Sequence, residues 1–232
     1  MRYIVCDVET TISNKGNPYD STNKLCSVGY YNSELDKCVV LPIEYDDSFF
    51  GDHLSRIRDS LVVDYFVAFN SKFDVAWLRR YGINIPKSCV IWDIQLFHFL
   101  SSNQSVAYPS LESVAAHYGF DGKLGNVSGY WDAGVDTPFI PWDELERYNI
   151  QDVRLEKEIF IKQYEEYLTW SIPRRNLFIL QCEDTRVLQE IEYNGMVYDV
   201  ENSLERSKDS LSLLEGLDKR LKGLCGEFPI NF

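Results

Sequence analysis

The chain has 232 residues, of which 45% are hydrophobic and 14% aromatic, so it can bury a sizeable core in one large domain or in one domain with an appendage. Its 36 acidic residues against 23 basic ones give a formal charge of −13, which argues against a protein that holds nucleic acid by a broad basic surface. This balance still allows an enzyme that meets phosphate through metal ions, or a chain whose partner supplies a basic groove.

The cysteines and the apolar segments exclude several other classes of protein. The six cysteines form no Cys-x-x-Cys pair and no cluster with the three histidines, which favours reduced thiols over a disulfide framework or a zinc site. The N-terminal apolar stretch is interrupted at Asp7, so it does not resemble a signal peptide. No segment approaches the ~20 apolar residues of a membrane span. We therefore expect a cytoplasmic protein with no membrane partner.

The first predicted element is a strand, YIVCDVET, which runs from apolar residues into two carboxylates. Alternate side chains of a strand share one face, so Asp7 and Glu9 are expected to point the same way. Two like charges at the end of a buried strand repel, and burying them is costly unless a cation lies between them. Taken alone, the stretch is equally compatible with a divalent metal site and with an acidic strand end that exits into solvent.

The elements that follow predict a layered α/β fold. A polar loop over 13–23 is rich in turn formers. Apolar runs predict strands at 25–31, 37–43, 65–69 and 89–92, and helical spacing predicts helices at 52–61 and 73–81. Asp93 and Ser110 are expected to be the N-caps of two further helices. The order predicts a mixed five-stranded sheet flanked by helices.

The second half of the chain changes from an irregular segment to long helices. Residues 121–138 are expected to form an irregular loop, and a helix is predicted from Pro141 to about Leu168. Two further long helices, ending near residues 194 and 224, are expected to form an antiparallel C-terminal helical pair. Near residue 171 the predicted elements change from those of a sheet domain to a pair of long helices, which predicts two domains, 1–170 and 171–232.

Carboxylates recur where predicted core elements end. Asp74 follows the fourth strand, at the edge of a sheet where ligands tend to bind. Tyr148 and Asp152 lie four residues apart, so they share one face of their helix. Two carboxylates from a strand, one from the segment after a neighbouring strand and one from a packing helix can therefore converge on a single point.

These motifs resemble those of a known family. Asp7-x-Glu9, the run Asn70-Ser71-Lys72-Phe73-Asp74, and Tyr148 followed by Asp152 occur in this order in the DEDDy 3′–5′ exonucleases. That family has RNase H-like folds and includes the proofreading domains of family A DNA polymerases and the RNase D group. The likeness covers about residues 1–168, and a tyrosine rather than a histidine in the third motif is typical of this subclass.

The resemblance implies hydrolysis assisted by two divalent metal ions, Mg²⁺ or Mn²⁺. Asp7 is expected to bridge both ions, and Glu9 and Asp152 to complete the first site. Asp74 is expected to serve the second site, and Tyr148 to orient the attacking water. Other interpretations are that Asp74 only caps a helix and that Tyr148 only fills the core.

The resemblance also implies where the substrate lies. Asn70 matches a position that contacts phosphate or sugar, and Phe73 one that packs beside the terminal nucleotide. Thr10 and Ile12 follow the acidic pair and are expected to line the same pocket. Asp93 is expected to act only as an N-cap.

Residues 171–232 resemble the segment that joins exonuclease to polymerase in family A enzymes, without the palm and fingers motifs. We therefore expect a proofreading exonuclease that acts on single-stranded DNA or frayed 3′ ends and releases nucleoside 5′-monophosphates. Its expected partner is the polymerase domain of the same or a companion chain, near the nucleoid of a bacterial or phage-infected cell. The alternatives are an RNase D-like exoribonuclease, against which the C-terminal segment argues, and a non-catalytic scaffold domain, which usually loses carboxylates.

Overall fold

The computed structural model describes residues 1–121 and 127–225. Residues 227–232, which are the last part of the segment that resembles family A polymerases, lie outside the described residues. The chain folds into two compact units, Met1–Tyr193 and Asn194–Phe232, and each is described by itself. The second unit contains one described helix, α8 (Val200–Cys225). The expected pairing of this helix with the one before it stays a prediction.

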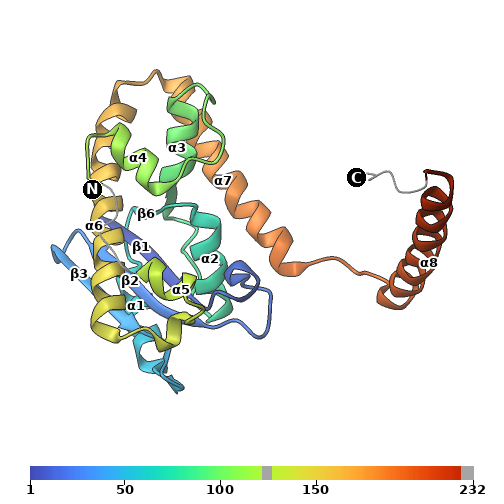
Figure 1. Ribbon diagram of the computed structural model, residues 1–232. Helices are drawn as coiled ribbons and strands as arrows, with labels where there is room; N and C mark the ends of the chain where they lie inside the picture. The colour runs from blue at the N-terminus through green and yellow to red at the C-terminus, as the bar shows by residue number, and fades with distance from the viewer. Residues whose placement is uncertain (122–126, 226–232) are drawn as a thin grey trace. The chain divides into compact units, whose positions relative to one another are not determined.

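A five-stranded mixed sheet lies at the centre of the first unit (Figure 1). In spatial order its strands are β3 (Lys37–Pro42), β2 (Leu25–Asn32), β1 (Tyr3–Thr10), β6 (Tyr65–Ala68) and β7 (Val90–Asp93). The first three form the predicted antiparallel meander, and β6 and β7 run parallel to β1. The predicted α/β fold is confirmed. A small hairpin of β4 (Glu44–Tyr45) and β5 (Ser48–Phe49) was not predicted, because each of its strands has only two residues.

Helices cover both faces of the sheet. They are α1 (Gly51–Ser60), α2 (Ser71–Arg80), α3 (Ile94–Ser101), α4 (Leu111–His117), α5 (Val127–Asp132), α6 (Trp142–Thr169) and α7 (Ile172–Asn194). Two N-cap predictions are confirmed, since Asp93 accepts a hydrogen bond from Leu96 N and Ser110 one from Ser113 N. The irregular loop predicted over 121–138 is wrong in part, because α5 and a short 3₁₀ turn (Thr137–Phe139) form within it.

Alternate residues of β1 enter two different cores, which is why its sequence is almost continuously apolar. Ile4 and Cys6 pack with residues of α1 and α2 on one face. Tyr3 and Val5 pack on the other face, with residues of α3, α4, α6 and α7. Asp7 and Glu9 have the register of Val5, so the carboxylates are presented on the face that α6 covers.

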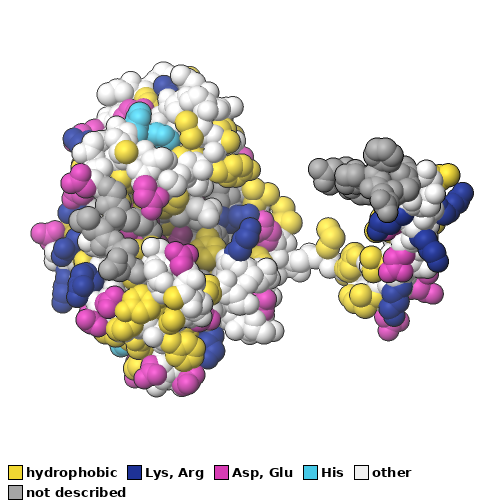
Figure 2. All heavy atoms as spheres, viewed as in Figure 1, with side chains coloured by type: hydrophobic (Ala, Val, Ile, Leu, Met, Phe, Trp, Pro, Cys, Tyr) yellow, Lys and Arg dark blue, Asp and Glu magenta, His cyan; other side chains and the backbone are white. Residues whose placement is uncertain are grey.

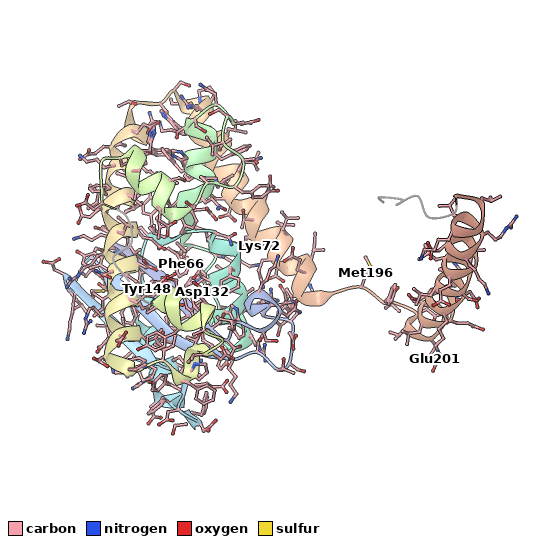
Figure 3. All side chains as sticks on the ribbon, in the orientation of Figure 1. Phe66, Lys72, Asp132, Tyr148, Met196 and Glu201 are labelled. Atoms are coloured by element: carbon pink, nitrogen blue, oxygen red, sulfur yellow. The ribbon has the colours of Figure 1, made fainter. Side chains whose placement is uncertain are left out.

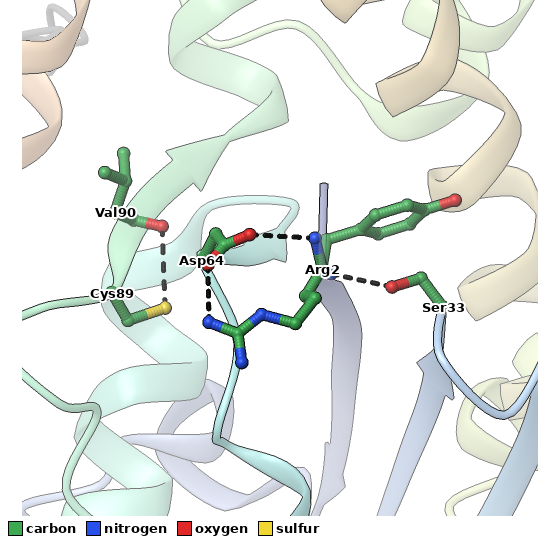
Figure 4. Close-up of polar contacts among 6 residues, drawn as sticks. Arg2, Ser33, Asp64, Cys89 and Val90 are labelled. Carbon is green, nitrogen blue, oxygen red and sulfur yellow. Dashed lines mark hydrogen bonds and ion pairs between the residues drawn. The ribbon is translucent and has the colours of Figure 1, made fainter.

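The starts of the central strands are tied together at the edge opposite to the carboxylates. The Arg2 guanidinium donates to Asp64 Oδ1 at 2.8 Å, and Arg2 N donates to Asp64 Oδ2 at 2.9 Å (Figure 4). Tyr3 N donates to Ser33 Oγ at 2.7 Å. The Arg2–Asp64 bonds connect the residues that precede β1 and β6, and the Tyr3–Ser33 bond connects the first residue of β1 to the residue that follows β2.

Helix α7 belongs to the first unit. Phe178 is fully buried, with its ring centroid 4.7 Å from Trp92 and 5.1 Å from Phe97, and Cys182 is buried beside it. The first compact unit therefore extends beyond residue 170, where the sequence predicts a domain boundary. Among the described residues, no helix combines the length and apolar character needed to cross a membrane.

Candidate metal centre

Three carboxylates from two elements meet at the end of β1. Asp7 and Glu9 come from the strand and Asp152 from the middle of α6, and one oxygen of each lies within 4.8 Å of the others. Glu9 and Asp152 are buried, and Asp7 is half-buried. Oxygens on opposite sides of a Mg²⁺ ion are at most about 4.2 Å apart, because each bond is about 2.0–2.1 Å long. Small side-chain rotations therefore suffice for the three residues to hold one hard divalent cation.

Asp74 lies beside this cluster. The structure begins α2 at Ser71, two residues before the predicted start, so Asp74 is the fourth residue of the helix and Asn70 has the N-cap position. The Asp74 carboxylate is buried and accepts a hydrogen bond from Val8 N at 3.2 Å, between the two acidic residues of β1. Burial raises the pKa of Asp74 well above its ordinary 3.8, and the charge of Asp7 raises it further.

This raised pKa predicts a pH-dependent response to metal. Without metal, the folded protein holds the Asp74 proton more tightly than the unfolded chain does, so this carboxyl stabilises the fold at low pH. That stabilisation is lost as the pH rises through the raised pKa. A bound cation offsets the resulting repulsion between carboxylates, so Mg²⁺ is expected to raise Tm more at about pH 8 than at about pH 5.5. Each kcal/mol that Mg²⁺ adds to the free energy of unfolding should raise Tm by roughly 2–4 °C.

The measurement is a thermal melt with Mg²⁺ and with chelator at each pH. Asp74→Asn is the control, because it cannot titrate and should flatten the pH dependence of the Mg²⁺ effect. An equal Mg²⁺ effect on the wild-type protein at both pH values would contradict the prediction.

Asn149 is a site residue that the sequence reasoning missed. Its side chain is fully buried on α6, and Nδ2 donates to Asp7 Oδ2 at 2.5 Å. The amide thereby fixes the orientation of the carboxylate that faces both Glu9 and Asp152. The signal in the sequence was a polar residue in the buried stripe of a long helix, three positions before Asp152.

Tyr148 lies one turn before Asp152 on α6, on the same face of the helix as that carboxylate, and its side chain is buried. Figure 3 labels it on this helix. Its ring packs edge-on against Trp131 of α5, with centroids 5.8 Å apart, in a small cluster that includes Leu145. Both expectations for Tyr148 are therefore compatible with the geometry. Its ring fills a small core, and it belongs to α6, the helix that also contains Asp152. Helix α5, within the segment predicted to be irregular, supplies its cover.

The four residues expected to meet substrate differ in what they can offer. Asn70 has a left-handed backbone (φ 57°), and its side chain makes no capping bond. Asn70 and Phe73 line a hollow of about 470 Å³. Thr10 is buried, and its carbonyl accepts from Thr137 Oγ1 at 2.6 Å, so its polar groups serve the fold. Ile12 is exposed, and its N–H donates to Asp136.

Side chains of α2 hold the polar loop after β1 by hydrogen bonds to its carbonyl oxygens. Trp77 Nε1 donates to Gly16 O, and the Arg80 guanidinium donates to the carbonyls of Pro18, Asp20 and Asn23. Gly16 has φ +65°, and a Cβ there would collide with Thr10 Oγ1. Helix α2 therefore holds the loop closely over the end of β1.

Asp93 organises the neighbouring turn. It accepts hydrogen bonds from Ser71 N at 2.7 Å and Ser71 Oγ at 2.8 Å, in addition to the capping bond from Leu96 N. Burial raises its pKa. These bonds hold the start of α2, and with it Asp74, against the end of β7.

No protein-family model matches the chain, and no curated protein matches it. Among solved structures, Brucella melitensis NrnC bound to pGG has a TM-score of 0.61 at 14% identity, covering 85% of this chain and 88% of that one. NrnC with bound Mg²⁺ has a TM-score of 0.59 at 13% identity, covering 85% and 89%.

A polymerase shares the same fold. The family B DNA polymerase from the hyperthermophilic archaeon Pyrobaculum calidifontis has a TM-score of 0.56 at 17% identity, covering 77% of this chain. The match takes in only 27% of the polymerase, so the chain spans about a quarter of that protein. At these identities the likeness concerns the fold, and it confirms the RNase H-like architecture.

Proposed function

We propose that the chain is a metal-dependent nuclease that removes nucleotides one at a time from 3′ ends. The observation that carries the proposal is the cluster of Asp7, Glu9 and Asp152 oxygens within 4.8 Å of one another, with Asp74 buried beside them. Isolated like charges in such a position are costly. Their convergence at the end of the central strand of an RNase H-like sheet is therefore explained best by a divalent cation.

In this proposal, Asp7 is the shared ligand of two cations, Glu9 and Asp152 hold the first, and Asp74 serves the second. When bound, Mg²⁺ or Mn²⁺ supplies a nucleophilic water and stabilises the charge on the attacking and leaving oxygens. Tyr148 orients the attacking water by a hydrogen bond. A neutral phenol donates a hydrogen bond readily, so this side chain would position the water rather than take a proton from it.

The substrate we favour is a single-stranded or frayed DNA 3′ end, with nucleoside 5′-monophosphates as products. Residues 171–232 support this choice by their resemblance to the segment before a family A polymerase domain. A proofreading role would give the chain a polymerase domain as its partner, in the cytoplasm of a bacterial or phage-infected cell. Asn70 and Phe73 would meet the terminal nucleotides.

A second candidate is a nuclease of short RNA. The likeness to the NrnC structure bound to pGG favours it, because the match covers 88% of that chain, against 27% of the polymerase. A non-catalytic scaffold is less well supported, because the chain keeps all four carboxylates. The substrate class is therefore the first property to measure.

The test uses DNA and RNA oligonucleotides of one sequence, labelled at either the 5′ or the 3′ end. With Mg²⁺ or Mn²⁺ we expect a 5′-labelled DNA strand to shorten stepwise and a 3′-labelled strand to release labelled mononucleotide at once. Chelator should stop both reactions. Faster hydrolysis of RNA would favour the second candidate, and no hydrolysis of either strand would contradict the proposed function.

A further inference from the structure

Two hollows meet at the start of α2, the helix whose first turn contains Asp74. One has a volume of about 400 Å³ and the other about 470 Å³, and both are lined by Asn70 and Lys72. The first continues toward α3 and the turn before α4, and the second toward the loop after β1. Helix α7 contributes to both, through Thr185 and Leu188 in the first and Glu192 in the second.

An ion pair stands where the hollows meet. Lys72 Nζ lies 2.7 Å from Glu192 Oε1, and the two side chains are 39% and 42% exposed. Figure 3 shows Lys72 at the start of α2 beside α7, and Figure 2 shows basic and acidic side chains together in this region. A pair so exposed to solvent contributes little to stability, so another anion can replace Glu192 at small cost.

The end of α7 is held by other contacts. Arg79 pairs with Glu190 at 2.6 Å, donates to Gln189 Oε1 at 2.9 Å, and stacks over the ring of Tyr193 with its guanidinium carbon 3.8 Å from the centroid. None of these three contacts involves the side chain of Lys72 or of Glu192. Helix α7 therefore stays docked when Glu192 is released.

The hollows are lined by equal numbers of basic and acidic side chains. Their basic side chains among the described lining residues are Lys15 and Lys72, and the acidic ones are Glu192 and Asp93. Asp93 is committed to Ser71 and to the helix cap. Glu192 is therefore the carboxylate that competes for the cations of this groove.

We propose that Lys72 binds a backbone phosphate of the substrate strand, and that Glu192 occupies this position in the free protein as a competing carboxylate. The inference rests on the proposed function, because it assigns the two hollows to the nucleic-acid strand whose 3′ end would lie at the metal centre. Binding of the strand exchanges one partner of Lys72 for another, and α7 remains as the outer wall of the groove.

The test compares Glu192→Gln with Asp184→Asn, which makes the same charge change at an exposed position of the same helix that is not among the described lining residues of either hollow. The probe is a fluorescein-labelled, phosphorothioate-linked oligothymidylate, titrated at low salt in Mg²⁺ and followed by fluorescence anisotropy. Glu192→Gln is expected to tighten Kd by roughly three- to fivefold, and Asp184→Asn to leave it near the wild-type value. Lys72→Gln should weaken binding and flatten its salt dependence.

The double variant decides the mechanism. If Glu192 acts by occupying Lys72, then Glu192→Gln has no effect in a Lys72→Gln background. Equal affinities of the Glu192→Gln and Asp184→Asn variants, or absence of binding by every variant, would overturn the inference. Hydrolysis of unmodified oligothymidylate by the wild-type protein is measured separately, so a protein that binds as expected but does not hydrolyse would overturn only the proposed function.

Discussion

Asp7→Asn is expected to lower the rate of hydrolysis by on the order of 10³-fold or more, with the fold intact. The substitution keeps the shape of the side chain, but it removes the negative charge and one of the two oxygens that we propose bind metal. Asp7 is the carboxylate that connects the site, since its oxygen lies within 4.8 Å of those of Glu9 and Asp152 and its charge acts on buried Asp74. The measurement is kcat on a single-stranded oligonucleotide in Mg²⁺.

The same variant should be more stable than the wild-type protein when no metal is present. Asparagine removes the like charge that raises the pKa of Asp74, so the metal-free site no longer strains the fold. Tm in chelator is expected to rise, and the rise that Mg²⁺ produces in the wild-type protein should be lost. This opposite response of stability and activity separates a metal site from a structural acidic cluster.

Asp143→Asn is the matched control for this prediction, because Asp143 lies in the first turn of α6 with its side chain 77% exposed. It should change neither kcat nor the effect of Mg²⁺ on Tm. An Asp7→Asn protein that retains activity within about tenfold of the wild type would contradict a bridging role for Asp7.

The sequence predicted the parts of the site that follow from local periodicity. Asp7 and Glu9 share a face because a strand alternates, and Tyr148 and Asp152 share one because a helix repeats every 3.6 residues. The start of α2 was predicted two residues too late, because left-handed Asn70 opens the helix without the usual capping bond. The predicted helix already contains Asp74, so the error only moves this residue from the second position of the helix to the fourth.

The parts that depend on packing between distant segments were not predicted. The sequence predicts that a new domain begins at about the start of α7. In the structure, Phe178 of this helix packs on Trp92 and Phe97, more than 75 residues earlier in the chain. Asn149 lies in the buried stripe of α6, but its contact with Asp7 depends on the register of α6 on the sheet. No local pattern encodes which residue of β2 lies beneath it.

That residue is Gly29, which pairs with Asp7 between β1 and β2. A Cβ at Gly29 would collide with Asn149 Oδ1 and would lie 3.0 Å from Val153 Cγ2. Helix α6 can therefore approach the sheet only where β2 has no side chain, which is the close approach that a glycine inside a strand often marks. The distance between Asp152 on α6 and Asp7 on β1 depends on this contact.

Gly29→Ala is therefore expected to lower the free energy of unfolding by about 1–3 kcal/mol, the usual cost of overpacking a close contact. Because α6 or Asn149 must move to admit the methyl group, Mg²⁺ affinity should fall as well. Urea denaturation measures the first effect, and a calorimetric Mg²⁺ titration measures the second. Gly129→Ala is the control, since a Cβ at that position on α5 has no neighbour within 4 Å among the described residues; Mg²⁺ affinity should stay near the wild-type value, and the free energy of unfolding should not fall, because alanine favours a helix over glycine by up to about 1 kcal/mol.

The double variant Gly29→Ala, Asn149→Ala separates packing from hydrogen bonding. Truncating Asn149 removes the atom nearest to the new methyl group, so the two substitutions should be non-additive and part of the lost stability should return. Mg²⁺ affinity should not recover, because Asp7 loses the donor that now lies 2.5 Å from its Oδ2. Full recovery of Mg²⁺ affinity in the double variant would mean that Gly29 acts on the site through the spacing of α6 alone, and that the Asn149 amide is dispensable for orienting Asp7.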